Sequence, residues 1–327
     1  MRTFKVLLIT AVLSAMLVTL AIGAFAMQKY TALCDLLTLS EPEDYPPLPE
    51  GFSPTGYADC PDGRLILGRY GKAARLYLYK DDGELTYITL YDEEEMPLGG
   101  RLGGLAVFDK YIYVGCDGDI LVYYYEDIEC FDERVIYYDK IKAYTVATSL
   151  SISGDFLYVG GYHPSEGCDG CATHLTSPAG DEGTSLITSF RLTTERGKGA
   201  VRYIIPTPVS AISVGSSLRG LAVDGKDVYI SRSDGKLFSS LEHHTLDTKR
   251  RSTVTVTDGE RQHKIPLLFL DSSTEKKRIN MPPMQRDVYI YGEKLYVLAE
   301  SPSVGGAYSR QLEGEKIYSF ELDALQK

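Results

Sequence analysis

Leu102-Gly-Gly-Leu-Ala-Val-Phe-Asp-Lys-Tyr-Ile-Tyr-Val114 aligns without a gap on Leu218-Arg-Gly-Leu-Ala-Val-Asp-Gly-Lys-Asp-Val-Tyr-Ile230. Each stretch holds two short apolar runs around a tight-turn sequence, which is typical of two antiparallel strands. Self-similarity of this kind marks a repeated structural unit. The sequence therefore predicts an all-β protein assembled from copies of one small antiparallel sheet.

Three further copies fit the same frame, at Gly56–Leu67, Leu150–Val159 and Val288–Leu298. A third apolar run follows in most copies, namely Leu76–Tyr79, Ile120–Tyr124, Leu186–Phe190, Ile317–Phe320 and the weaker Lys236–Phe238. An outer fourth strand is predicted at Tyr87–Leu90, Val135–Tyr138 and Tyr203–Ile205. Three or four antiparallel strands per repeat correspond to one blade of a β-propeller.

We expect the blades to close into a ring, because a single blade cannot bury its apolar faces and an open stack leaves strand edges exposed. Equivalent positions Ile66, Tyr113, Tyr158, Tyr229 and Tyr296 are 47, 45, 71 and 67 residues apart, which favours five blades and leaves six open. Two stacked sandwich domains are the alternative architecture. The last copy lacks an outer strand, and the apolar segment Leu33–Leu39 is predicted to supply it.

The N-terminus resembles an export signal. Arg2 and Lys5 precede an uncharged apolar run, Val6–Met27, and Ala24-Phe25-Ala26 offers small residues at the spacing of a signal-peptidase site. The run is also long enough to span a bilayer as a helix. Residues 1–27 are therefore predicted to be a signal peptide or a transmembrane anchor, residues 28–51 a tether containing the ring-closing strand, and residues 52–327 the propeller.

This reading places the propeller outside the cytoplasm, either secreted or anchored to the membrane by residues 6–27. Six cysteines in such a compartment predict disulfide bonds, whose pairing stays open. The net charge of −11 argues against nucleic acid as a partner, because a phosphate backbone requires a clustered positive field. A small molecule, a glycan or a protein are the partners left open.

A family resemblance rests on Pro54-Thr55-Gly56, Gly103–Ala106, Leu218–Ala222, Met281–Met284 and Leu295–Ser301. From residue 52 to the C-terminus the chain resembles a loosely defined group of exported bacterial β-propeller proteins without an assigned function. In that group a polar-Gly or Gly-Gly pair opens the innermost strand of each blade. Thr55, Arg101, Arg219 and Arg286 stand at or near these places, so the resemblance does not carry a ligand over to this chain.

The candidate ligand-binding residues are those predicted to face the mouth of the central channel, the usual binding site of propellers. Arg219 and Arg286 begin innermost strands, and Glu300 ends the second strand of the last copy. Guanidinium groups there suit an anionic or hydroxylated ligand. Ion pairs that hold the blades together are the alternative role.

A second candidate site is a metal cluster on a Gly-rich insertion, formed by His163, Cys168, Cys171 and His174. Two thiolates and two imidazoles can satisfy tetrahedral zinc. The spacing is tighter than in usual zinc motifs, and an exported Cys-x-x-Cys more often forms a disulfide. We therefore predict no cofactor.

The remaining motifs suggest no chemistry. Asp117-Gly118 and Asp224-Gly225 are predicted to be hairpin turns, and His243-His244 to lie on a polar surface loop. Without a recognisable catalytic set, the predicted function is an extracytoplasmic ligand-binding or scaffold module. The alternative is a hydrolase or lyase that acts through Glu300 with Arg219 or Arg286 at the channel mouth.

Overall fold

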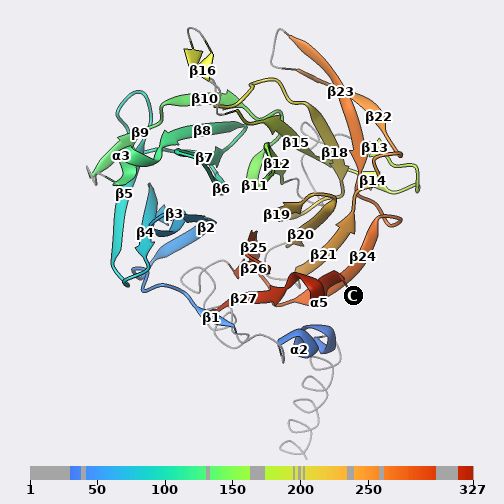
Figure 1. Cartoon of the computed structure of the whole chain (residues 1–327), viewed down its shortest axis with the longest axis horizontal. Helices are drawn as coiled ribbons and strands as arrows, with labels where there is room; N and C mark the ends of the chain where they lie inside the picture. The colour runs from blue at the N-terminus through green and yellow to red at the C-terminus, as the bar shows by residue number, and fades with distance from the viewer. Residues whose placement is uncertain are drawn as a thin grey trace, which may run out of the picture.

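Five antiparallel sheets are arranged as blades around a common axis in the computed structural model (Figure 1). It describes residues 30–37, 42–129, 133–162, 174–193, 196–197, 200–201, 203–233, 239–257, 261–299 and 316–326. The prediction of a five-bladed propeller is confirmed, and both the six-bladed ring and the paired sandwiches are excluded. The apolar segment of residues 6–27 lies outside the described residues.

Four strands build each blade, numbered here from the N-terminus as blades 1 to 5. The innermost strands are β2 (Phe52–Cys60), β6 (Leu102–Phe108), β11 (Ala147–Ser153), β19 (Leu218–Asp224) and β25 (Gln285–Tyr291). The second strands are β3 (Gly63–Tyr70), β7 (Tyr111–Cys116), β12 (Phe156–Gly161), β20 (Asp227–Arg232) and β26 (Lys294–Ala299). The third strands are β4 (Ala73–Lys80), β8 (Asp119–Tyr124), β15 (Ser185–Arg191), β21 (Ser239–Thr245) and β27 (Lys316–Glu321). The outer strands are β5 (Leu85–Tyr91), β10 (Asp139–Lys142), β18 (Ser210–Val214), β24 (Glu275–Met281) and β1 (Glu43–Asp44).

The ring is closed by the chain segment that precedes blade 1. Strand β1 pairs antiparallel with β27, so Glu43 lies opposite Ile317 in blade 5. The prediction that Leu33–Leu39 supplies this strand is wrong, because Thr31–Leu37 forms helix α2. Leu33 and Leu36 of this helix are buried in the apolar core that blades 4 and 5 share with the C-terminal helix α5 (Leu322–Gln326).

Two insertions each supply a strand that pairs with the preceding blade and not with the blade they belong to. This explains why the sequence pattern placed some strands incorrectly. Strand β9 (Arg134–Ile136) was predicted in blade 2 but pairs in parallel with β5 of blade 1. Likewise β23 (Gln262–Phe269), which pairs with β22 (Ser252–Thr257), extends from blade 4 and pairs in parallel with β18 of blade 3. Around Tyr203–Ile205 only an isolated bridge forms, between Leu192 and Ile204. The predicted run Lys236–Phe238 lies outside the described residues.

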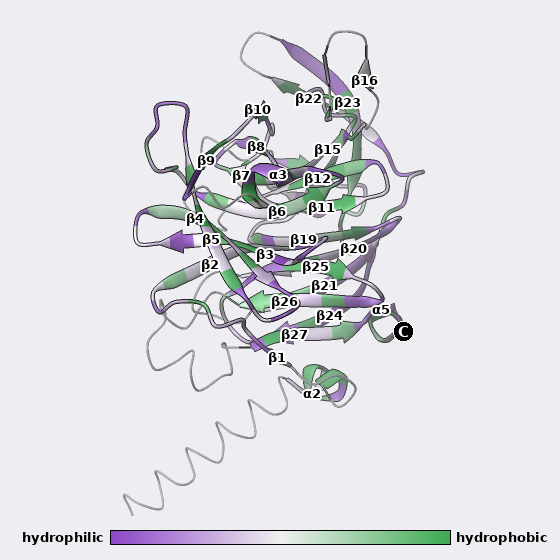
Figure 2. Ribbon diagram, turned by 60° about the vertical axis from the view of Figure 1, so that its left-hand side comes forward, coloured by the Kyte–Doolittle hydropathy of each residue, from purple (hydrophilic) through white to green (hydrophobic). Residues whose placement is uncertain are grey.

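Smaller elements occupy the surface. They are the hairpin of β13 (Leu175–Thr176) and β14 (Glu182–Gly183), the hairpin of β16 (Arg196–Gly197) and β17 (Ala200–Val201), and helix α3 (Tyr125–Glu129). The Asp-Gly turns are confirmed, since Asp117 and Gly225 adopt φ of +51° and +59° between consecutive strands. Figure 2 shows hydrophobic segments along the strands that stack between neighbouring blades.

Apolar side chains fill the interfaces between neighbouring blades, and tyrosine contributes the largest of them. Tyr57, Tyr113, Tyr123, Tyr229 and Tyr318 are fully buried. A strand places alternate side chains on opposite faces, so each blade contributes to two interfaces. The many tyrosines and the absence of Trp are thus accommodated by ring packing between sheets.

The innermost strands share one irregularity, a break in register near their start. It falls between Pro54 and Gly56, Leu102 and Leu105, Ala147 and Ser149, Leu218 and Gly220, and Gln285 and Asp287. Directly after it, neighbouring strands come so close that a Cβ on Gly104 would lie 2.3 Å from the Leu150 amide nitrogen. A Cβ on Gly220 would lie 2.6 Å from the amide nitrogen of Val288. Glycine is required at these two positions because the backbones touch.

Asp287 occupies the equivalent position in blade 5, where the first and last blades meet. Its Oδ2 accepts a hydrogen bond from the Tyr57 backbone N–H at 3.1 Å, and its Oδ1 accepts one from Val288 N–H at 2.9 Å. The carboxyl group is buried, and this burial raises its pKa to about 8, more than the two hydrogen bonds lower it. One side chain thus bridges this junction, whereas at three of the other junctions glycine lets the backbones touch directly.

We predict that Asp287 makes stability fall as pH rises. Between its ordinary pKa of 3.8 and about 8, the folded protein keeps a proton that the unfolded chain releases. Asp287→Asn keeps an acceptor oxygen and does not titrate. In urea unfolding, the free energy of unfolding of the wild type should therefore fall by several kcal/mol relative to that of the variant as pH rises between these values. The expected slope is about 1.4 kcal/mol per pH unit. A difference between the two proteins that does not change with pH would contradict the prediction.

Candidate functional site

The exit ends of all five innermost strands surround a cavity of about 270 Å³ on the ring axis. Its lining consists of Tyr57, Ala58, Asp59, Leu105, Ala106, Val107, Leu150, Ser151, Ile152, Val223, Tyr289, Ile290 and Tyr291. Most of the lining residues are apolar or aromatic, but polar atoms, backbone groups included, form about half of the surface that the cavity exposes. Small-molecule sites usually have volumes of roughly 300–1,000 Å³, so this cavity suits only a small ligand.

Asp59 is the carboxylate among these lining residues. Partial burial raises its pKa to about 6, although the nearby Arg64 opposes the shift. The guanidinium Nε of Arg64 lies 3.9 Å from the Asp59 carboxylate, and its Nη1 lies 3.5 Å from Glu43 on the ring-closing strand. Asp59 therefore changes charge close to neutral pH, and it is only loosely paired.

A stack of tyrosine rings forms one wall of the cavity. Tyr57 and Tyr289 stack with centroids 4.7 Å apart, and Tyr289 stacks on Tyr296 at 4.9 Å. Burial raises the pKa of Tyr57 to about 12, so its hydroxyl is neutral at physiological pH. The stack joins blade 5 to blade 1 and gives the cavity a rigid aromatic side.

The predicted arginines lie at the opposite ends of the innermost strands, where each occupies the register break. Arg286 donates from Nη2 to the Leu102 carbonyl at 3.4 Å and so connects blade 5 to blade 2, which is not its neighbour. Arg219 donates from Nε to the Ser233 carbonyl at 3.3 Å, and its guanidinium lies 3.9 Å from the ring centroid of Tyr162. Both arginines thus bind backbone carbonyls, and Arg219 also contacts an aromatic ring. Glu300 lies outside the described residues.

The predicted metal cluster is described only at His174. This histidine pairs through Nδ1 with Glu182 at the β13–β14 hairpin. His163, Cys168 and Cys171 lie outside the described residues, as does Cys130. Cys34, Cys60 and Cys116 carry free thiols, and burial raises the pKa of Cys116 to about 11.

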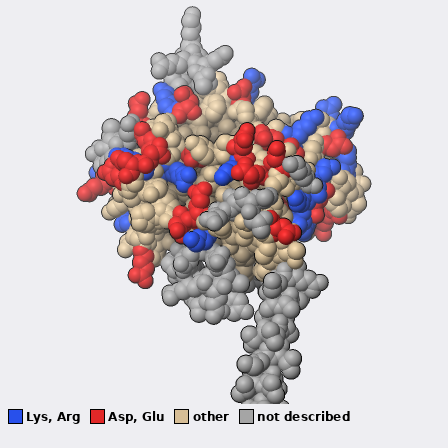
Figure 3. All heavy atoms as spheres, turned by 60° about the horizontal axis from the view of Figure 1, so that its bottom comes forward, with Lys and Arg blue, Asp and Glu red and all other residues tan. Residues whose placement is uncertain are grey.

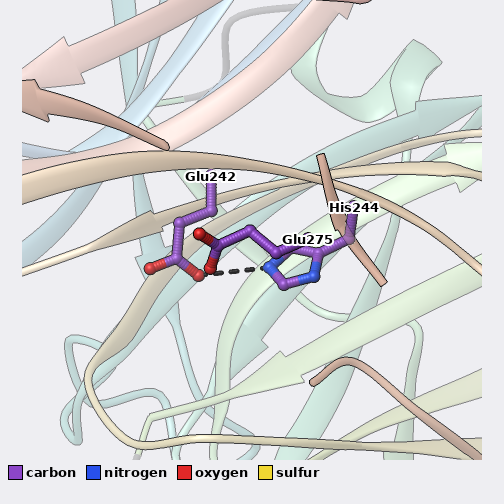
Figure 4. Close-up of side chains that lie close together, drawn as sticks. All are labelled: Glu242, His244 and Glu275. Atoms are coloured by element: carbon purple, nitrogen blue, oxygen red, sulfur yellow. Dashed lines mark hydrogen bonds and ion pairs between the residues drawn. The ribbon is translucent and has the colours of Figure 1, made fainter. Parts of the chain in front are cut away.

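A charged cluster that sequence reasoning missed lies in blade 4. His243 and His244 were predicted on a surface loop, which is wrong, because both are buried in strand β21. His243 stacks on Tyr229 and contacts Asp227 at 2.9 Å. His244 points to the other face, toward blade 3, and approaches Glu242 and Glu275 there (Figure 4).

Glu242 is the centre of this second cluster and is fully buried. Its Oε2 accepts from Arg232 Nε at 2.7 Å and from His244 Nε2 at 3.2 Å. Its Oε1 accepts from Ser240 Oγ at 3.2 Å and lies 3.1 Å from Nη2 of Arg278. Burial alone would raise the pKa of Glu242, but the His244 hydrogen bond and the two arginines outweigh it and lower the pKa to about 2.

The ligand atoms of Glu242, His244 and Glu275 lie within 4.8 Å of one another, a grouping that can hold a metal ion. Each oxygen of Glu242 already has two donors, however, and Arg278 also pairs with Glu275 at 2.6 Å. Two arginines balance the two carboxylates, so no excess negative charge is available to a cation. The arrangement is therefore an ion-pair network within blade 4, in which loss of one partner would leave a buried charge without compensation.

Comparison with known proteins assigns the chain to no family. No family model matches the chain, and no curated protein matches it. A nidogen/laminin complex structure has 13% identity and a TM-score of 0.38 over 75% of this chain and 72% of that one. A Thermus thermophilus oxidoreductase (glucose dehydrogenase) has 15% identity and a TM-score of 0.39 over 82% and 96% of the two chains.

A further similar structure is PorZ, a bacterial surface component of the type-IX secretion system of Porphyromonas gingivalis. It has 11% identity and a TM-score of 0.33, over 79% of this chain and 29% of PorZ. Likeness at this level establishes neither a family nor an activity. Fold and cavity together define a five-bladed β-propeller with a ligand-sized hollow on its axis. In the described part of the chain, no helix has the length and apolar character needed to cross a membrane.

We predict that Glu242→Gln destabilises the protein by about 3–5 kcal/mol at neutral pH, because it leaves the partly buried Arg232 without its carboxylate partner. The matched control is Glu275→Gln, whose partner Arg278 is half exposed, and it should change stability by less than about 1 kcal/mol. The pKa of Glu242 is lowered from 4.5 to about 2, so its contribution is present above pH 4.5 and disappears as pH falls toward 2. Chemical denaturation of both variants across this range checks the prediction, and equal effects of the two substitutions would contradict it.

Proposed function

We propose that this chain is an extracytoplasmic binding module that holds a small ligand in the axial cavity. The observation that carries the proposal is the cavity itself, which all five innermost strands line with apolar and tyrosine side chains around one carboxylate. A cavity built by the closed ring is already formed before the ligand arrives, and preorganisation of this kind favours binding.

The lining indicates the chemistry of the ligand. An apolar or aromatic body would pack against Leu105, Leu150 and the tyrosine wall, while a cationic or hydrogen-bond-donating group would face Asp59. Glu43 and Asp81 also add negative potential at Asp59, and the whole chain is acidic. A small aromatic amine therefore fits better than an anion.

Binding is favoured over catalysis by the chemical inventory of the cavity. Among the described lining residues, Asp59 and Ser151 are the polar groups apart from tyrosine hydroxyls. The Ser151 hydroxyl already accepts a hydrogen bond from Val223 N–H at 2.9 Å. Among the described residues, no hydrogen bond connects Ser151 to a base that would activate it as a nucleophile.

Export and attachment belong to the same proposal. The basic and apolar segment at the N-terminus would carry the propeller across the membrane and would then be removed after Ala26 or kept as an anchor. The propeller would in both cases meet its ligand outside the cytoplasm. N-terminal mass spectrometry of the exported protein distinguishes the two outcomes.

We predict that tyramine binds in the cavity and that 4-hydroxyphenylacetate, its anionic counterpart, does not. Saturation-transfer NMR on the purified chain should show tyramine contacts that Val107→Phe abolishes by filling the cavity. Asp59→Asn should weaken binding about tenfold, which corresponds to one charge-assisted hydrogen bond. Binding to the wild type should also weaken below pH 6, where Asp59 becomes protonated.

The matched control is Asp224→Asn, an exposed acid that ends innermost strand β19 and does not line the cavity. It should bind tyramine as the wild type does. Tyramine contacts that persist unchanged in Val107→Phe would show that the ligand sits elsewhere, and the proposed site would be wrong.

A further inference from the structure

The outer edges of the blades differ in how well they are protected against further strand pairing. An exposed edge strand pairs readily with another chain unless it is short, charged or covered. Strand β1 has only two residues and β9 only three. Strand β10 carries Lys140 and Lys142, which pair with Asp119 of β8 at 3.4 and 3.8 Å, and β24 contains Lys276, Lys277 and Arg278.

Blade 3 is the exception, because its outer edge strand is neither short, charged nor covered. Strand β23 covers its fourth strand, β18, and β22 pairs with β23, so β22 is the edge strand of this sheet. The sequence of β22 is Ser252-Thr-Val-Thr-Val-Thr257. This strand has six residues, none of them charged, and five are β-branched. Its register with β23 runs without a bulge from Ser252 opposite Leu267 to Thr257 opposite Gln262. In the described part of the chain, β23 is its pairing partner and the other side of β22 has none.

One face of β22 packs against the protein and the other is exposed to solvent, and among the described residues its outer backbone edge has no partner strand. Val256 is buried in an apolar cluster with Ile265 and Leu267, and Val254 packs against the same cluster. Thr253, Thr255 and Thr257 are exposed on the opposite face. An added strand could extend this sheet with its own alternating pattern, because opposite residues on paired strands share a face.

The surroundings of this edge are basic although the chain is acidic. Residues 249–264 contain five Lys or Arg and two acidic residues, against a net charge of −11 for the chain. Lys249 and Arg251 are exposed just before the strand, and exposed Lys264 lies opposite Thr255. On the face drawn in Figure 3, acidic side chains gather at the left and centre and basic ones at the right, so charge is unevenly distributed over the surface.

We propose that β22 accepts an extended, acidic segment of another protein as an additional strand of blade 3. The backbone edge would supply the hydrogen bonds, and the basic residues around it would select negative charge. The chain already uses this type of contact twice, since β9 adds to the edge of β5 and β23 to the edge of β18. A second copy fits less well, because antiparallel self-pairing would bring like basic groups together.

The test uses a fluorescein-labelled peptide with a Val-Thr-Val-Thr-Val core flanked by Asp and Glu, and the full chain as receptor. Fluorescence anisotropy should show saturable binding of this peptide and at least about tenfold weaker binding of the same core flanked by Lys. The double variant Arg251→Glu with Lys264→Glu should lose about tenfold in affinity for the acidic peptide. The control Lys140→Glu makes the same kind of charge reversal on the protected edge β10 and should leave binding unchanged.

Backbone pairing is tested with Val254→Pro and Thr255→Pro. Successive N–H groups in a strand point to opposite sides, so one of these prolines removes an outward donor and keeps the bonds to β23. That variant should keep the melting temperature of the wild type and lose peptide binding. Absence of wild-type binding, or full binding by both proline variants, would overturn the proposal. A concentration-dependent dimer in sedimentation velocity that the same proline abolishes would overturn it as well, by making a second copy the occupant.

Discussion

The architecture depends on one constraint, the direct contact of neighbouring innermost strands just after their register breaks. Gly56, Gly104 and Gly220 have no side chain there, and a Cβ on any of them would lie under 3 Å from the backbone of the next blade. The ring is therefore narrow at this level, and its diameter follows from strand-to-strand approach. Asp287 satisfies the same constraint with a side chain, because its carboxyl group reaches the Tyr57 amide where blades 5 and 1 meet.

Contact at this level also explains where a ligand can enter the ring. The innermost strands touch near their starts, and among the described residues a free volume on the axis lies at their exit ends, beside Asp59 and Tyr289. At the other end, Arg286 extends from blade 5 to a carbonyl of blade 2. The close contact and the hollow thus lie at opposite ends of the same strands.

The sequence predicted the blades well because their innermost pairs repeat both pattern and turn chemistry. It failed where the determining interaction is not local. Strand β1 is two residues long and lies between prolines, so no periodicity distinguishes it from a tether. The strand pattern likewise shows only that β9 and β23 are strands. It does not show that each of them pairs in parallel with a strand of the preceding blade.

The buried cluster of blade 4 was missed for a related reason. Ser240, Glu242 and His244 alternate with Leu241 and His243, which is a strand period, but the polar face suggested exposure to solvent. Its partners Arg232 and Arg278 come from β20 and β24, and only the register of three strands brings them together. The alternation, together with the third strands of the other blades, was the signal that could have placed these residues in a strand.

Three carboxyl groups of the chain show how charge is divided between stability and binding. Glu242 has four donors and a pKa lowered to about 2, so its lone pairs are all used within the fold. Asp287 has two backbone donors, and burial raises its pKa to about 8, so it closes the ring largely as a neutral group at the lower pH values. Asp59 differs from both, because its one cationic neighbour lies 3.9 Å away and is shared with Glu43. An outside donor gains most from an acid whose hydrogen-bonding capacity the fold leaves incompletely used, and this is why we propose ligand binding at Asp59 and not at the more conspicuous Glu242 cluster.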